Sequence, residues 1–86
     1  MPNVVMYTSR VCPYCSRAKR LLDRKGVTYE ERMLDLSPES REALVELTGR
    51  YTVPQVLVDE TPIGGYDDIA ALDQTGELDR ILGLTA

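Results

Sequence analysis

The chain has 86 residues, a formal net charge of −4, two cysteines and no histidine. This length supports one domain with a modest core, which we place at residues 1–86. No apolar run approaches the roughly 18–20 residues that span a bilayer, and an acidic chain with few aromatic residues is not typical of a nucleic-acid-binding protein.

The chain begins with a predicted strand and a predicted helix. Residues 4–8 form a short apolar run that indicates a buried strand. Residues 16–25 place three apolar side chains on one side of a predicted helix, and Gly26 is a suitable residue to end it. Both cysteines therefore lie at a strand-to-helix junction.

The two cysteines at this junction read Cys12-Pro13-Tyr14-Cys15. Two intervening residues place both sulfurs within one turn, and Pro13 suits the first helical turn because its missing N–H costs little there. Cys12 then faces the helix N-terminus, where free N–H groups and the helix dipole favour a thiolate. Since the thiolate is the nucleophile in disulfide exchange, the pair indicates a reversible dithiol–disulfide centre.

Three other interpretations of these cysteines carry less weight. A structural disulfide across so small a loop constrains the unfolded chain little. A structural zinc site needs about four ligands, usually Cys or His, and the chain has no His and no further Cys. Two inert buried thiols remain an alternative, because free Cys is common in protein cores. We therefore expect no metal.

Positive charge is concentrated in the segment that contains the cysteines. Residues 10–25 carry one acid, Asp23, against six bases, namely Arg10, Arg17, Lys19, Arg20, Arg24 and Lys25. The simplest interpretation is a solvated helix face. The functional interpretation is a positive field beside Cys12 that favours a thiolate and anionic substrates.

A second helix is predicted from its caps. Ser37 suits the N-cap, Pro38 the first helical position, and Gly49 the end of the helix. We expect three apolar residues to form its buried side: Leu44, Val45 and Leu47.

Three further strands and a third helix complete the pattern. Residues 27–33 alternate imperfectly and carry many charges, which suits an edge strand. Residues 55–58 and 61–63 predict a hairpin, and a third helix is expected to start at Asp67 or Asp68. A short amphipathic segment follows Gly76.

This order of elements predicts an α/β fold with a four-stranded mixed sheet and helices on both faces. A strand, a crossover helix and a strand imply a parallel pair with a right-handed connection. We predict the order second, first, third, fourth (2-1-3-4). The central first strand would then bring the cysteines to the carboxyl edge, where open α/β sheets place ligand sites.

Two later motifs suit ligand binding. Pro54 directly precedes a predicted strand, so it is either an ordinary strand-entry proline or part of a cis Val53–Pro54 bond. A cis bond would leave the backbone of Val53 free to pair with an extended ligand. The Gly64-Gly65-Tyr66-Asp67-Asp68 segment is either a glycine-rich turn with an Asp N-cap or a helix N-terminus that binds an amino-acid head group.

These motifs together resemble those of a dithiol glutaredoxin of the small bacterial type. The resemblance rests on Cys12-Pro13-Tyr14-Cys15, Thr52-Val53-Pro54 and Gly64-Gly65-Tyr66-Asp67-Asp68, and it covers essentially the whole chain. It implies the thioredoxin fold. It also implies a glutathione-dependent oxidoreductase that reduces protein disulfides and protein–glutathione mixed disulfides, with glutathione as electron donor and no metal.

The resemblance also implies roles for individual residues. Cys12 would be the nucleophile and Cys15 the resolving thiol, while Arg50 would face the glycine carboxylate of glutathione. The other implied contacts to glutathione come from Tyr14, Thr52, Val53, Pro54, Gly65, Tyr66, Asp67 and Asp68.

Two positions depart from the family pattern. Ser9 stands where the family often has a Lys, so Arg10 is the predicted substitute in contacting glutathione. Tyr66 stands where many relatives carry a third cysteine, which removes one site of side oxidation.

Two alternative functions are considered beside this one. A thioredoxin-like protein reduced by a flavoprotein would share the cysteine pair, but Arg50, Gly64-Gly65 and Asp68 argue against it. An iron–sulfur carrier would hold a cluster through Cys12 and two glutathiones, and in the family Pro13 is unfavourable to that. We expect a cytoplasmic protein, because the chain enters a strand without a basic and apolar leader. We also expect a monomer.

Overall fold

The computed structural model describes residues 2–35 and 37–84, and its elements follow the predicted order. The strands are β1 (Val4–Thr8), β2 (Glu30–Met33), β3 (Gln55–Val58) and β4 (Thr61–Gly64). The helices are α1 (Pro13–Arg24), α2 (Pro38–Thr48), α3 (Tyr66–Thr75) and α4 (Glu77–Ile81).

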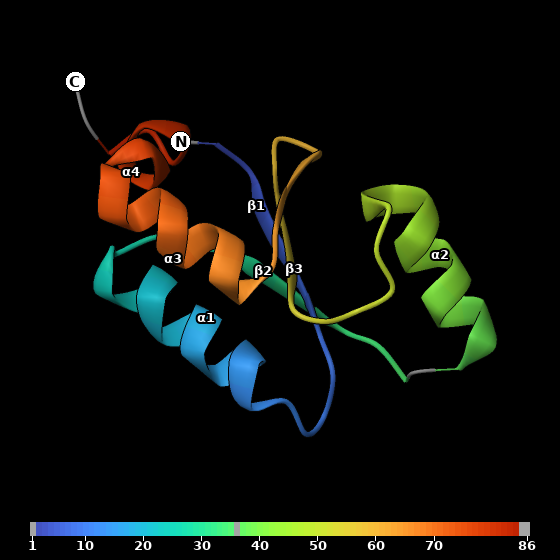
Figure 1. Cartoon of the computed structure of the whole chain (residues 1–86). Coiled ribbons are helices and arrows are strands. Elements are labelled where there is room, and N and C mark those ends of the chain that lie inside the picture. Colours follow the sequence, from blue (N-terminus) through green and yellow to red (C-terminus); the bar gives the residue numbers. More distant parts are fainter. Residues whose placement is uncertain (1, 36, 85–86) are drawn as a thin grey trace.

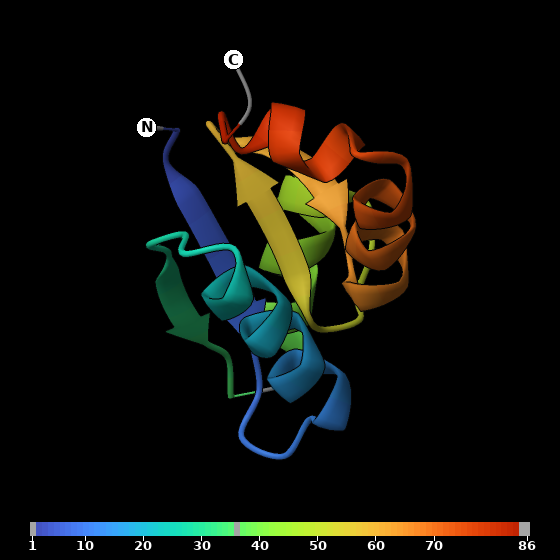
Figure 2. The ribbon, with the colours of Figure 1, turned by 90° about the vertical axis from the view of Figure 1, so that its left-hand side faces the viewer.

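The sheet has the predicted order β2-β1-β3-β4. β2 runs parallel to β1, while β3 is antiparallel to both β1 and β4. Helices α1, α3 and α4 cover one face of the sheet and α2 lies on the other (Figure 1). The same layers appear in the orthogonal view, where α1 stands in front of the sheet (Figure 2). β1 is central, so the loop after it lies between the two halves of the sheet.

The core lies between the sheet and α1, α3 and α4. Met6 of β1 and Leu22 of α1 are fully buried there, and Ile69 and Leu78 join them from α3 and α4. Burying one Leu side chain contributes about 1.5–3 kcal/mol. This packing fixes the position of α1, whose N-terminus follows the loop after β1.

The second strand is shorter than predicted. Its pairing with β1 starts at Glu30, opposite Val5, rather than at residue 27. Val27 is buried, and its N–H donates to Leu22 O at 3.2 Å. Val27 therefore belongs to the end of α1, and the chain reaches the sheet edge only three residues later.

The predicted buried side of α2 is correct at only one of its three residues. Leu44 is buried, but Val45 and Leu47 are 42 % and 49 % exposed. One stripe of the helix contacts the sheet, and neighbouring positions along a helix are turned about 100° apart. The caps are as predicted, because Ser37 Oγ accepts from Ser40 N and Gly49 ends the helix in the left-handed conformation.

Helix α3 begins at Tyr66, slightly earlier than Asp67 or Asp68. Asp68 occupies the third helical position, where its carboxylate accepts a hydrogen bond from the N–H of the N-cap residue Gly65. This capping contact needs one helical turn before Asp68, which explains the earlier start.

Candidate active site

Cys12 is the N-cap residue of α1, which begins at Pro13 and so starts earlier than the predicted range 16–25. Its backbone is extended, with φ −148° and ψ 99°, and its Sγ accepts a hydrogen bond from Cys15 N at 3.1 Å. The first N–H groups of a helix lack partners within the helix, so a side chain at the N-cap completes them. Cys12 Sγ therefore accepts from one of the first N–H groups of α1 and is held at the start of the helix.

Cys15 lies one turn further along α1 in a different environment. It is 2 % exposed, whereas Cys12 is partly exposed. Burial, reinforced by the hydrogen bond to Cys12, raises the pKa of the Cys15 thiol to about 12. Cys15 therefore keeps its proton at neutral pH, and Cys12 is the thiol accessible to a substrate.

The Val53–Pro54 segment faces the cysteines. The Val53–Pro54 peptide bond is cis, one of the two forms that the sequence left open. The carbonyl oxygen of Val53 lies 3.7 Å from Cys12 Sγ, and Pro54 is buried directly before β3. Val53 therefore lies at the point where a ligand bound to Cys12 would pass.

A groove of about 280 Å³ extends from this point along the start of α3. It brings together nine of the ten predicted glutathione-contacting residues: Tyr14, Arg50, Thr52, Val53, Pro54, Gly65, Tyr66, Asp67 and Asp68. These residues come from three separate parts of the chain, and the fold places them along one wall beside Cys12.

Gly65 is required by the close approach of two backbone segments. A Cβ atom at this position would lie 2.9 Å from the carbonyl oxygen of Pro54. Since real Cβ atoms essentially never approach so closely, any larger residue would push the start of α3 away from the Pro54 segment. The width of the groove therefore depends on this glycine.

Arg50 and Asp68 contact each other across the groove. Arg50 Nη1 lies 2.6 Å from Asp68 Oδ2, and the same oxygen accepts from Gly65 N at 2.9 Å. The Arg50 guanidinium, followed by the Gly65 N–H, lowers the pKa of the Asp68 carboxyl group. The sequence predicted both residues at the site, but it did not predict that they pair.

One residue of the groove lining, Gln55, and one residue beside the groove, Arg17, were not predicted. Arg17 places its guanidinium carbon 5.2 Å from the centre of the Tyr14 ring, which itself lies 6.4 Å from the Tyr66 ring. Gln55 is buried in the groove wall and donates to Thr52 Oγ1 at 3.3 Å. A polar residue at the first position of an apolar strand was the available signal for Gln55.

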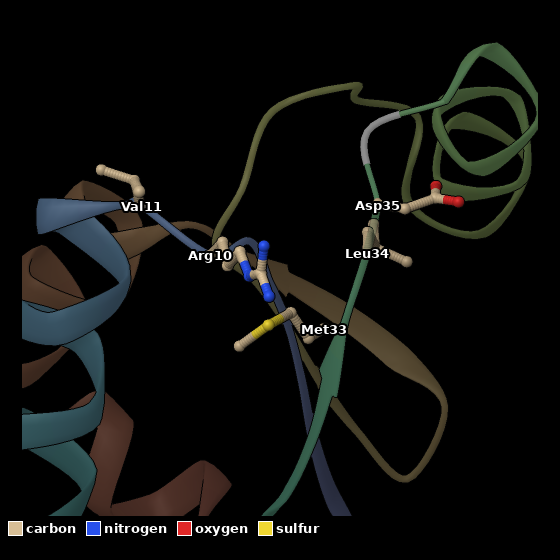
Figure 3. A pocket seen from close by; sticks show the side chains of 5 residues that line it. All are labelled: Arg10, Val11, Met33, Leu34 and Asp35. Atoms are coloured by element: carbon tan, nitrogen blue, oxygen red, sulfur yellow. The ribbon is translucent and has the colours of Figure 1, made fainter.

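Arg10, the tenth predicted contact, lies away from this groove. It lines a separate pocket of about 500 Å³, in which its side chain points toward Met33 (Figure 3). Val11, Leu34 and Asp35 complete that pocket. Ser9 is buried. Neither Ser9 nor Arg10 lines the groove described above.

Metal and membrane features can be stated for residues 2–35 and 37–84. Within these ranges, no three His, Cys, Asp or Glu side chains are grouped so that they could hold a metal ion. No helix in the same ranges combines the length and the apolar character needed to span a bilayer.

Comparison with known proteins identifies the family. The Glutaredoxin family matches residues 4–63. The chain belongs to the glutaredoxin family. It is 51 % identical to a glutaredoxin of Pseudomonas aeruginosa over 82 residues, covering 95 % of this chain and 98 % of that one. It is 49 % identical to glutaredoxin 3 of Escherichia coli over 82 residues, covering 95 % and 99 %.

Solved glutaredoxin structures share the fold. A buckwheat glutaredoxin–glutathione complex has a TM-score of 0.85 and 33 % identity, covering 95 % of this chain and 77 % of that one. A glutaredoxin from Brucella melitensis has a TM-score of 0.83 and 44 % identity, covering 95 % and 89 %. As a glutaredoxin with the thioredoxin fold, this chain is a glutathione-dependent thiol–disulfide oxidoreductase, and the thioredoxin-like alternative is set aside.

Proposed function

We propose that Cys12 is the nucleophile and Cys15 the resolving thiol in the reduction of glutathionylated and disulfide-containing proteins. The observation that carries this assignment is the pairing of an accessible Cys12 Sγ with the N–H of a buried Cys15. Only Cys12 is exposed enough for a protein-bound disulfide to reach it. Cys15 stays protonated until it attacks the mixed disulfide at Cys12.

Reduction of a glutathionylated protein needs only Cys12. Its thiolate attacks the glutathione sulfur, which forms a Cys12–glutathione disulfide and releases the protein sulfur as a thiolate that takes up a proton. A second glutathione thiolate then attacks the bound glutathione sulfur. This step frees the Cys12 thiolate and produces glutathione disulfide, so the sulfur of the second glutathione becomes oxidised as the protein sulfur is reduced to a thiol.

Reduction of a protein disulfide uses both cysteines. Cys12 attacks one sulfur and the other leaves as a thiol, so the substrate is tied to Cys12. Cys15 gives up its proton and attacks the Cys12 sulfur, which releases the second substrate thiol and leaves a Cys12–Cys15 disulfide. Two glutathione molecules then return this disulfide to the dithiol and form glutathione disulfide.

We assign glutathione to the 280 Å³ groove beside Cys12. The backbone at Thr52 and Val53 would bind its cysteinyl part beside Pro54. Arg50 would meet the glycine carboxylate, and Asp68 the γ-glutamyl ammonium with the Tyr66 and Asp67 backbone. The ion pair between Arg50 and Asp68 would exchange for these contacts, which is feasible because both side chains are about half exposed.

The solved buckwheat relative was crystallised as a complex with glutathione, which supports this assignment. Arg10 stays a proposed contact of glutathione, although it lines a separate pocket. We also propose that the chain acts as a cytoplasmic monomer, since a redox-active rather than structural cysteine pair suits a reducing compartment.

The test is turnover of a glutathionylated small thiol with glutathione, glutathione reductase and NADPH. We expect steady NADPH consumption that depends on glutathione and on Cys12. Turnover that persists when thioredoxin reductase replaces glutathione and its reductase would contradict the proposal.

A further inference from the structure

A basic hollow lies beside the groove and is not used by the chemistry described above. It has a volume of about 440 Å³ and is lined by Arg17, Arg20, Asp23, Arg24 and Tyr66, which we call the arginine channel. The three arginines are spaced three and four residues apart, so they share one side of α1. That side meets the start of α3, because α1 and α3 pack together.

The three arginines of the channel lack the ion-pair partners that two lysines of the same segment have. Lys19 pairs with Glu31, and Lys25 pairs with Asp73 and Asp79. Among the described residues, no carboxylate lies within salt-bridge distance of the three channel arginines, all of which are exposed. Asp23 is the only acid in the lining. The channel therefore presents an excess of positive charge, although the chain as a whole carries −4.

The channel continues from the glutathione groove. Tyr66 lines both, and Arg17 lies over the ring of Tyr14, which lines the groove. Glutathione is the ligand proposed for the groove, so a substrate protein joined to it through a disulfide would lie outside the groove. Tyr66 lies on the border of the groove and the channel, so the arginines are within reach of a protein segment placed there.

We propose that the arginine channel binds an acidic segment of the substrate protein near the cysteine that is being reduced. The inference rests on the proposed nucleophile and groove, and it adds a preference among protein substrates. Complementary charge at the edge of an interface mainly raises the association rate and is weakened by salt. The continuity with the groove favours a protein segment over a nucleic acid.

The test compares peptides that each carry one glutathionylated cysteine. One set of three peptides carries Asp, Ser or Lys at the same positions before the cysteine. A second set of three carries these residues at the same positions after it. For the wild-type protein at low salt, we expect the Asp peptide to have the highest kcat/KM in one of the two sets. That set shows on which side of the cysteine the acidic segment binds. This preference should shrink at about 0.5 M salt, where the screening length is only a few ångströms.

Charge-reversal variants locate the effect. Arg20→Glu and Arg24→Glu should each lower kcat/KM for the acidic peptide about two- to five-fold, the range expected for one exposed ion pair. Neither residue lines the glutathione groove, so turnover of a glutathionylated small thiol should be unchanged. Arg41→Glu is the matched control, because Arg41 is an exposed base on α2, across the sheet (Figure 1).

The outcomes separate this proposal from the function on which it rests. Loss of small-thiol turnover in the wild type would overturn the proposed function. Normal small-thiol turnover with equal rates for the three peptides would overturn only the arginine channel, as would an equal loss in Arg41→Glu. A single-stranded oligonucleotide that competes better than the acidic peptide would also contradict the proposal.

Discussion

In the proposed function, the start of α1 and the wall of the groove would contact the same ligand in different ways. At the start of α1, one N–H and two sulfurs form the reactive centre, with Cys15 N 3.1 Å from Cys12 Sγ. The groove wall instead distributes its contacts over side chains and backbone from the end of α2 to the start of α3. One substitution at the cysteines should thus abolish the reaction, whereas each substitution in the groove wall should weaken glutathione binding only in part.

The largest effect is expected at the cysteines. Cys12→Ser should lower both deglutathionylation and protein-disulfide reduction to the rate without enzyme, because no nucleophile remains. Cys15→Ser should keep deglutathionylation within about three-fold but lose most protein-disulfide reduction, since an intramolecular thiol has a high effective concentration. Both assays at equal glutathione measure this. If Cys15→Ser lost deglutathionylation, the assigned roles would be wrong.

The reduced protein should label at one cysteine only. A pKa of about 12, in place of the ordinary 9.0, leaves Cys15 with about a thousand-fold less thiolate at pH 8. Iodoacetamide at pH 8 should therefore add one group, on Cys12, and the second only after unfolding. Peptide mass spectrometry locates the label. Equal labelling of both cysteines in the folded protein would contradict the burial of Cys15.

The high pKa of Cys15 also predicts how stability depends on pH. The folded state holds this proton more tightly than the unfolded state, so the associated stability is complete below about pH 9 and is lost as the pH rises toward 12. Cys15→Ser should flatten this alkaline decline in thermal unfolding of the reduced protein. An identical decline in both proteins would assign it to other groups.

Within the groove, the largest effect is expected at Gly65. In Gly65→Ala, the new Cβ would meet Pro54 O at 2.9 Å, and relieving such a contact costs about 1–3 kcal/mol. The KM for glutathione should therefore rise at least several-fold. The alkylation rate of Cys12 is the internal control and should stay close to that of the wild type, because the start of α1 is not displaced. An unchanged KM would show that the groove does not bind glutathione at this point.

Smaller effects are expected for the ion pair across the groove. Arg50→Ala and Asp68→Ala should each weaken glutathione binding by under about 1 kcal/mol, because both side chains are about half exposed. If each residue contacts a different end of glutathione, the double variant should show the sum of the two losses. If they act only on each other, it should lose no more than either single variant.

Local sequence determined the bounds of the buried central strands and the caps of α2. The apolar runs of β1 and β3 have the predicted bounds, because every residue of a central strand lies in or near the core. Ser37 and Gly49 likewise delimit α2 as predicted, since capping depends on contacts within one turn. The placement of Cys12 at the start of α1 follows from the same local rules.

Tertiary structure decided how much of each element is covered and which distant charges meet. Val45 and Leu47 lie on an apolar part of α2, but only the sheet's position determines that Leu44 alone is buried. Arg50 and Asp68 are 18 residues apart, and they pair because the Pro54 segment and α3 converge at Gly65. Periodicity and capping reflect interactions within a few residues, whereas these contacts depend on surfaces that form only when the whole chain packs.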